Sequence, residues 1–186
     1  MKRIAFIILS CLMALSVMAQ KEHLKFMGIP LNGNITTFQE KLKAKGISYN
    51  RTASAKTKAG VRCFDGIFSG EKARIYVYYN EKTKIVYRAK AVIEFSNKDI
   101  GEQRFEKFKS MLKEKYLTAY AKDSEQDGYP SMGMLVYDSE FDKSLGIISL
   151  YMTDTGYSFM DEVYLHVDYE DDANTSSDMD KNMDDL

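Results

Sequence analysis

The chain has 186 residues, two cysteines and a formal net charge of −1. This near-neutral total hides an asymmetry, because residues 20–167 carry a net +4 whereas residues 168–186 carry eight acidic side chains and one lysine. So modest a positive charge, beside an acidic end, argues against a nucleic-acid partner, which calls for a strongly basic surface.

The first nineteen residues have the anatomy of a secretory signal peptide. Lys2 and Arg3 precede an apolar stretch over residues 4–15, and Ala19 ends a small-residue cleavage site. The stretch is too short to span a bilayer, which takes about 20 apolar residues. We therefore expect cleavage after Ala19, a periplasmic or secreted protein, and no transmembrane segment after cleavage. The alternative is a lipoprotein box, ILSC, that anchors the chain at Cys11.

The segment GIPLNGNIT places two glycines at the spacing of a phosphate-binding loop. Such a loop needs a lysine and then a hydroxyl side chain directly after the second glycine, but Asn34 and Ile35 follow here. We interpret the segment as a turn that delivers Asn34 or Thr36 as the cap of a helix.

Cys63 is the one cysteine left after the leader, so the exported chain must be stable without an internal disulfide. It lies in the apolar, strand-like stretch VRCFDGIF. A catalytic thiol needs a histidine and an electropositive setting, and the two histidines, His23 and His166, are far away in sequence. We expect a buried, inert side chain.

A helical pattern recurs at an offset of 70 residues, in FQEKLKAKG (38–46) and FKSMLKEKY (108–116). Each copy precedes a polar, turn-rich loop, at 50–60 and 121–133, and then three strand-like stretches. The sequence therefore predicts two tandem α+β units, at residues 20–96 and 97–169.

Apolar side chains recur at helical spacing in both helices. The first has Ile35, Phe38 and Leu42 on one face and ends at Gly46. The second follows the capping candidates Ser96, Asn97 and Asp99, and its expected core stripe is Ile100, Phe105, Phe108, Met111 and Leu112.

The strand-like stretches alternate between core and solvent. The expected core side chains of the first unit are Ile75, Val77, Tyr79, Tyr87, Ala89, Ala91, Ile93 and Phe95. Hairpin loops are expected at YYNEKTK and at TDTG (153–156). We predict an α+β fold in which the helices cover one face of an antiparallel sheet of about eight strands, with the other face open to water.

The chain ends in an acidic segment, residues 170–186, that has too little apolar surface to order itself. We expect a disordered tail, and leave open whether it binds cations weakly or lies over basic residues of the sheet.

The water face of the predicted sheet combines tyrosines with positive charge. Its expected members are Arg74, Tyr76, Tyr78, Arg88, Lys90, Tyr137, Tyr151, Tyr164 and His166. Tyrosine and arginine are over-represented among residues that dominate protein interfaces, although tyrosine also favours strands for its own sake.

Motifs of catalysis are scarce. The metalloprotease, redox, dinucleotide and serine-hydrolase signatures are absent, and Ser110–Lys113 fits Ser-x-x-Lys without its companion motifs. His166 with Asp168 offers two ligands at most. We therefore expect no enzyme, no cofactor and no metal site.

The chain resembles the small exported proteins of unknown function common in Bacteroidota, through its MA-Q junction, its opening LKFMGIPLNGNITTFQEKLKAKG and its helix-then-meander plan. Its architecture is similar to the tandem repeat of the beta-lactamase inhibitor protein family over residues 24–169. That resemblance implies a concave eight-stranded surface, and no inhibitory residue carries over.

Two functions follow as expectations. The first is a non-enzymatic module whose tyrosine-rich, partly basic face binds an envelope or extracellular protein, peptide or glycan. The alternative is a small periplasmic hydrolase or ligand-sensing domain with a pocket near the loop at residues 50–60.

Overall fold

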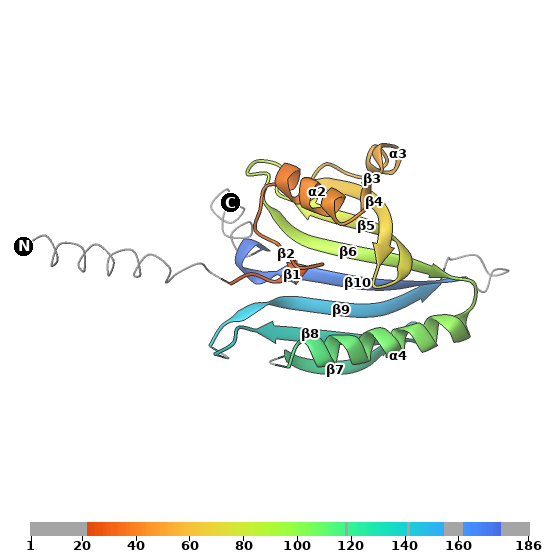
Figure 1. Cartoon of the computed structure of the whole chain (residues 1–186). Coiled ribbons are helices and arrows are strands. Elements are labelled where there is room, and N and C mark those ends of the chain that lie inside the picture. The colour runs from red at the N-terminus through yellow and green to blue at the C-terminus, as the bar shows by residue number, and fades with distance from the viewer. Residues whose placement is uncertain (1–21, 118, 141, 155–161, 176–186) are drawn as a thin grey trace, which may run out of the picture.

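The protein is an α+β molecule built on one antiparallel sheet of eight strands, in the order β3-β4-β5-β6-β10-β9-β8-β7. It is described by a computed structural model, which covers residues 22–117, 119–140, 142–154 and 162–175 (Figure 1). The expected signal peptide, the lipidation alternative at Cys11 and residues 176–186 lie outside these ranges. No helix within them is long and apolar enough to cross a membrane.

Each half of the sheet follows its own helix. The first half consists of α2 (Ile35–Ala44), β3 (Ser48–Tyr49), β4 (Val61–Phe68), β5 (Glu71–Tyr79) and β6 (Val86–Phe95). The second consists of α4 (Lys98–Lys115), β7 (Ala119–Gln126), β8 (Tyr129–Tyr137), β9 (Ser144–Asp154) and β10 (Val163–Asp171). The last strands of the two halves, β6 and β10, pair at the centre of the sheet.

Both main helices begin at an asparagine cap. The Asn34 side chain accepts a hydrogen bond from the Thr36 backbone N–H at 2.9 Å, and Asn97 does the same for Ile100. Gly46 follows α2 with a φ of +80°, as expected of a C-terminal glycine. The turn interpretation of GIPLNGNIT is confirmed.

The buried face of α4 is narrower than expected, whereas that of α2 agrees with the prediction. Phe38 and Leu42 of α2 are buried, as are Phe105, Phe108 and Leu112 of α4. Ile100 and Met111, expected in the core, are 39% and 41% exposed. They are wrong predictions, because the long helix crosses the sheet with only one narrow face in contact and these two residues lie beside it.

A third element covers the same sheet face as the helices. The short strands β1 (Lys25–Phe26) and β2 (Ile29–Pro30) form a hairpin that lies between α2 and α4 (Figure 1). Phe26 is fully buried and stacks on Phe68 with ring centroids 5.3 Å apart, and its edge meets Tyr169 at 5.4 Å. This hairpin closes the core between the two helices.

The loop expected at residues 121–133 is wrong, because this segment forms the hairpin of β7 and β8. Asp127 and Gly128 connect the strands with φ angles of +54° and +76°. Two successive left-handed residues form the tight turn that suits the twist of antiparallel strands, and Asp-Gly is a preferred pair there.

The polar stretch at residues 50–60 contains a short helix, α3 (Arg51–Ser54), where a loop was expected. Asn50 caps it by accepting the Ala53 N–H at 2.8 Å. The Ser54 hydroxyl accepts the Cys63 N–H at 2.8 Å, which fastens the segment to β4. Cys63 is fully buried, as expected, and burial raises the pKa of its thiol.

A β-bulge at the start of β6 changes which residue is buried there. The register shifts between Tyr78 and Tyr79, so that Tyr79 opposes Val86. Val86 therefore takes the buried position that simple alternation gives to Tyr87, which is only half-buried. Of the two expected hairpin loops, YYNEKTK connects β5 and β6, whereas TDTG begins in β9 and ends outside the described residues.

The second unit ends later than residue 169. Strand β10 continues to Asp171, which is completely buried, and residues 172–175 form one helical turn. Asn174 donates a hydrogen bond of 2.6 Å to the Leu31 carbonyl. The prediction that the tail starts at residue 170 is thus wrong. Asp171 is part of the fold because its carboxylate accepts hydrogen bonds from backbone and side-chain groups there.

Candidate binding face

The sheet face turned away from the helices carries eight of the nine expected binding residues. We call the surface that they form the open face: Arg74, Tyr76, Tyr78, Arg88, Lys90, Tyr151, Tyr164 and His166. They alternate along β5, β6, β9 and β10 with the core residues of the same strands. Tyr137 stands apart, because it ends β8 and lines a different cavity together with His23 and Tyr116.

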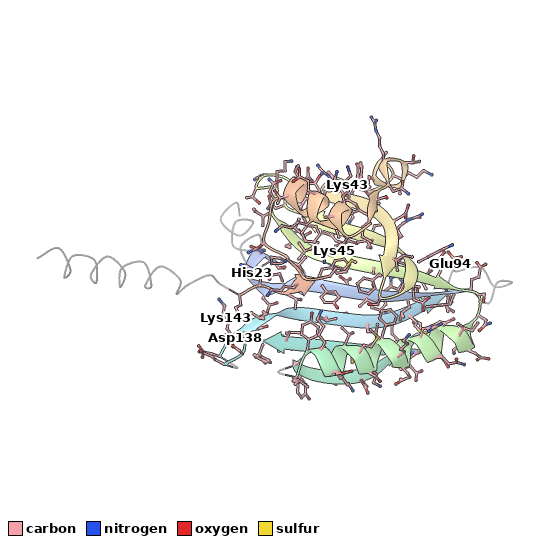
Figure 2. All side chains as sticks on the ribbon, in the orientation of Figure 1. His23, Lys43, Lys45, Glu94, Asp138 and Lys143 are labelled. Carbon is pink, nitrogen blue, oxygen red and sulfur yellow. The ribbon has the colours of Figure 1, made fainter. Side chains whose placement is uncertain are left out.

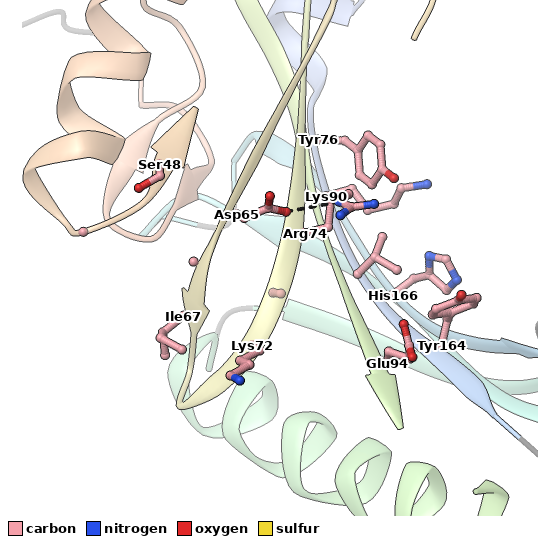
Figure 3. A pocket seen from close by; sticks show the side chains of 14 residues that line it. Ser48, Asp65, Ile67, Lys72, Arg74, Tyr76, Lys90, Glu94, Tyr164 and His166 are labelled. Atoms are coloured by element: carbon pink, nitrogen blue, oxygen red, sulfur yellow. Dashed lines mark hydrogen bonds and ion pairs between the residues drawn. The ribbon is translucent and has the colours of Figure 1, made fainter. Parts of the chain in front are cut away.

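Strand register brings the two halves of the chain together on the open face. Tyr76 lies opposite Lys90, and Lys90 lies opposite Asp168 of β10. One row further along the sheet, His166 is flanked by Val92 and Tyr151. Figure 3 shows Tyr76, Lys90, His166 and Tyr164 projecting to the same side of the sheet.

The arginines of the open face are neutralised within the protein. Arg88 makes two hydrogen bonds to the Asp168 carboxylate, of 2.9 and 2.5 Å, and its third nitrogen lies 3.8 Å from Glu170. These contacts raise the pKa of Arg88, the hydrogen bond with Asp168 foremost. Arg74 is 3.1 Å from Asp65. The face is therefore less basic than its list of cations indicates.

Cations also rest on the tyrosine rings. The Arg88 guanidinium lies 5.0 Å from the Tyr78 ring centroid, and the Lys90 ammonium lies 5.8 Å from that of Tyr76. Burial raises the pKa of Tyr78 to about 12 and lowers that of Lys90. Tyr78 is therefore an uncharged donor at physiological pH, and Lys90 is a cation that gains from a partner able to pair with it.

His166 is held on three sides. Its ring stacks on Tyr151 with centroids 4.5 Å apart and planes 3° from parallel, and Tyr164 meets its edge at 6.4 Å. Nε2 shares a hydrogen bond of 2.9 Å with the Thr153 hydroxyl, while Nδ1 is buried with no partner among the described residues. Burial, aided by nearby Lys90, lowers the pKa of His166 to about 4, so the ring is neutral at pH 7.

A shallow groove of about 1040 Å³ runs along the open face and over its edge. Asp65, Lys72 and Arg74 line one part of it, and Lys90, Tyr164 and His166 another. The groove thus presents both signs of charge beside aromatic rings, which suits a partner with mixed polarity.

Sequence reasoning missed three residues that organise this face. The sequence patterns place Asp65 only in an apolar stretch, indicate Asp168 only as a metal ligand beside His166, and place Thr153 in a turn. Period-two alternation in VRCFDGIF could have placed Asp65 on the open side of β4. The partners of Asp168 and Thr153 depend on pairing across the sheet.

Two observations bear on the alternative hypothesis of a hydrolase or ligand-sensing domain. No cluster of three metal-binding side chains occurs in the described part of the chain. A cavity of about 470 Å³ lies beside Lys58 and Gly60, at the loop of the alternative hypothesis, and Tyr78 and Arg88 extend into it from the open face.

Comparison with protein-family models, with curated proteins and with solved structures finds no match for this chain. The function is therefore argued from the geometry of the open face.

Proposed function

We propose that the chain is an exported, non-enzymatic binding module whose open face takes an envelope or extracellular protein or peptide. The observation that carries this proposal is the continuity of the face: tyrosines and cations of the first half of the chain, on β5 and β6, meet tyrosines and His166 of the second half, on β10 and β9. Four neighbouring strands span roughly 15 Å at the usual spacing, which is wide for a single sugar ring and suits a polypeptide surface.

The contacts within the face favour binding because they fix side chains in advance. Arg88 is held by Asp168 and Tyr78, and His166 by Tyr151 and Thr153. Immobilising a long or aromatic side chain on binding costs about 0.5–1.5 kcal/mol, and side chains that are already fixed avoid much of that cost. Tyrosine and arginine then supply contact area and hydrogen bonds to the partner.

Two features of the proposal come from sequence alone. Export rests on the leader at residues 1–19, and the resemblance to the beta-lactamase inhibitor protein family rests on the order of elements. That family resemblance remains a prediction, and the partner that we propose does not depend on it.

The proposal is tested by affinity capture from an envelope extract of the native organism. The bait is the mature chain, and the variant carries Tyr76→Ala and Tyr78→Ala together. We expect the wild type to retain a defined protein that the double variant loses, while thermal unfolding followed by circular dichroism stays nearly unchanged.

The matched control is Tyr49→Ala, because Tyr49 is 43% exposed yet packs against Phe64, on the helix side of the sheet. It should retain the captured protein. Treating the extract with protease beforehand separates the two partner classes, since a glycan survives it and a polypeptide does not. Equal capture by the double variant and the wild type would refute the proposal.

A further inference from the structure

A second candidate site lies where the N-terminal segment meets the end of β10. His23 Nδ1 is 3.1 Å from both carboxylate oxygens of Asp171. Asp171 is completely buried and also accepts the Leu24 N–H at 2.9 Å and two donors of Asn174, at 3.1 and 3.2 Å. Segments almost 150 residues apart in sequence are joined by this one carboxylate, which holds the imidazole in a single orientation.

The other ring nitrogen of His23 is left available. Nε2 makes no hydrogen bond within the described part of the chain, and the side chain is 11% exposed. Because the carboxylate occupies the Nδ1 side, Nε2 is the atom that a ligand meets. Figure 2 shows His23 at the end of the sheet where Asp138 and Lys143 lie, close to the turn between β8 and β9.

His23 lines a cavity of about 1180 Å³. Its apolar walls come from Leu24, Leu117, Val136 and Leu145. Sites for small molecules commonly measure about 300–1,000 Å³ and combine apolar walls with a few polar groups, so this cavity is large enough for one.

The charged lining is mainly positive. Lys25 and Lys115 face the cavity with His23, and Glu22 is the one carboxylate among the lining residues. The hydroxyl of Tyr116 is turned toward the backbone of Lys25, 3.4 Å from its carbonyl oxygen. Two lysines and an oriented imidazole in the lining of a partly apolar cavity complement a molecule with an anionic head and an apolar body.

We propose that this cavity binds a small amphipathic carboxylate. Its head lies between His23 Nε2 and the lysine ammonium groups, and its apolar part packs on Leu117, Val136 and Leu145. In the bound state the imidazole carries a second proton, taken from the solvent because the ligand enters as its anion, and donates through Nδ1–H to Asp171 and through Nε2–H to the ligand carboxylate. The site is separate from the open face and does not depend on the proposed function.

The test uses sodium octanoate as the probe and octan-1-ol as its uncharged match. The mature chain contains only His23 and His166, so their imidazole C2–H resonances can be followed directly by proton NMR. We expect octanoate to bind about tenfold more tightly than octanol, to shift the His23 resonance and to leave that of His166 in place.

Two variants separate the head contact from the apolar walls. His23→Asn retains a donor for Asp171 at the place of Nδ1 but lacks Nε2, and should weaken octanoate about tenfold with octanol unchanged. Leu117→Ser changes a side chain that is 84% exposed, so the fold is preserved, and should weaken both probes. His166→Asn is the matched control and should change neither.

The proposal is overturned if octanoate fails to bind at millimolar concentration, if it binds without moving the His23 resonance, or if His23→Asn and Leu117→Ser bind it as the wild type does. Because both variants leave the open face intact, these outcomes do not bear on capture of a protein partner there.

Discussion

His166 lies on the open face, and its surroundings move its pKa well away from the usual value of a histidine. Its pKa is lowered to about 4, mainly by burial, against about 6.5 in an unfolded chain. Between pH 4 and pH 6.5 the unfolded chain binds a proton at His166 that the folded chain does not bind. The contribution of His166 to the free energy of unfolding is therefore complete above pH 6.5 and is lost as the pH falls toward 4.

We therefore expect His166→Gln to be less sensitive to acid than the wild type. From pH 7 to pH 5 the wild type should lose about 2 kcal/mol of unfolding free energy through this residue, a loss that the variant escapes. Urea unfolding of both chains at the two pH values measures the difference. An identical pH dependence would show that His166 titrates normally.

Arg88 and Asp168 form the most enclosed ion pair of the open face, with side chains 33% and 6% exposed. Removing the cation by Arg88→Met leaves a nearly buried carboxylate without its hydrogen bonds, which should cost about 3 kcal/mol. Adding Asp168→Leu removes the stranded charge and should recover at least half of the loss. Urea unfolding of both single variants and of the double variant completes a double-mutant cycle. If the changes in unfolding free energy of the two single variants simply added up in the double variant, the pairing of Arg88 with Asp168 would be contradicted.

At the residue scale, the sequence predicts which side chains share a face but not which of them pair. Alternation along β5 and β6 correctly places Arg74, Tyr76 and Tyr78 together, because it needs no knowledge of neighbouring strands. The Arg88–Asp168 pair joins residues 80 positions apart. No local pattern contains that contact, so the neutralisation of Arg88 could not be predicted.

At the scale of elements, the junction of β9 with β10 depends on Gly146. Its φ is +150°, and a Cβ there would lie 2.1 Å from the Glu170 carbonyl oxygen. Gly146→Ala should therefore cost about 3 kcal/mol or more, since backbone rather than a flexible side chain must move.

Gly133→Ala, on neighbouring β8, is the control for this substitution. A Cβ at Gly133 meets no atom within 4 Å, and its backbone needs no left-handed conformation. We expect its unfolding free energy to remain within about 0.5 kcal/mol of the wild type. Equal losses for the two variants, measured by thermal or urea unfolding, would contradict the close approach at Gly146.

Elements were predictable where one periodic pattern was uninterrupted. The helices α2 and α4 and the strands β5 and β6 were found, because their core residues recur regularly. The β7–β8 hairpin was missed because AKDSEQDG is almost wholly polar, and only its Asp127–Gly128 turn signals it. The helix α3 was missed because it has no buried residue and therefore no periodic apolar pattern. The bulge at Tyr87 could not be predicted because it depends on pairing with the neighbouring strand.

At the scale of the whole molecule, the pairing of β6 with β10 creates the open face. It places Ala91 opposite Val167 and Lys90 opposite Asp168, thereby joining two halves that each carry only part of the surface. The sequence predicts the α+β class and about eight strands. It does not predict the order of the strands, which is set by long-range packing, and the internal repeat and its likeness to the beta-lactamase inhibitor protein family remain predictions.

Photo-crosslinking in living cells tests the role of the open face most directly. Tyr76 is replaced by photoreactive benzoylphenylalanine in one chain, and Tyr49 in a matched chain, and both are irradiated in the native envelope. We predict that position 76 crosslinks to one defined protein, that position 49 does not, and that Tyr78→Ala weakens the crosslink. Equal crosslinking from both positions, or none from position 76, would contradict the open face as the partner-binding surface.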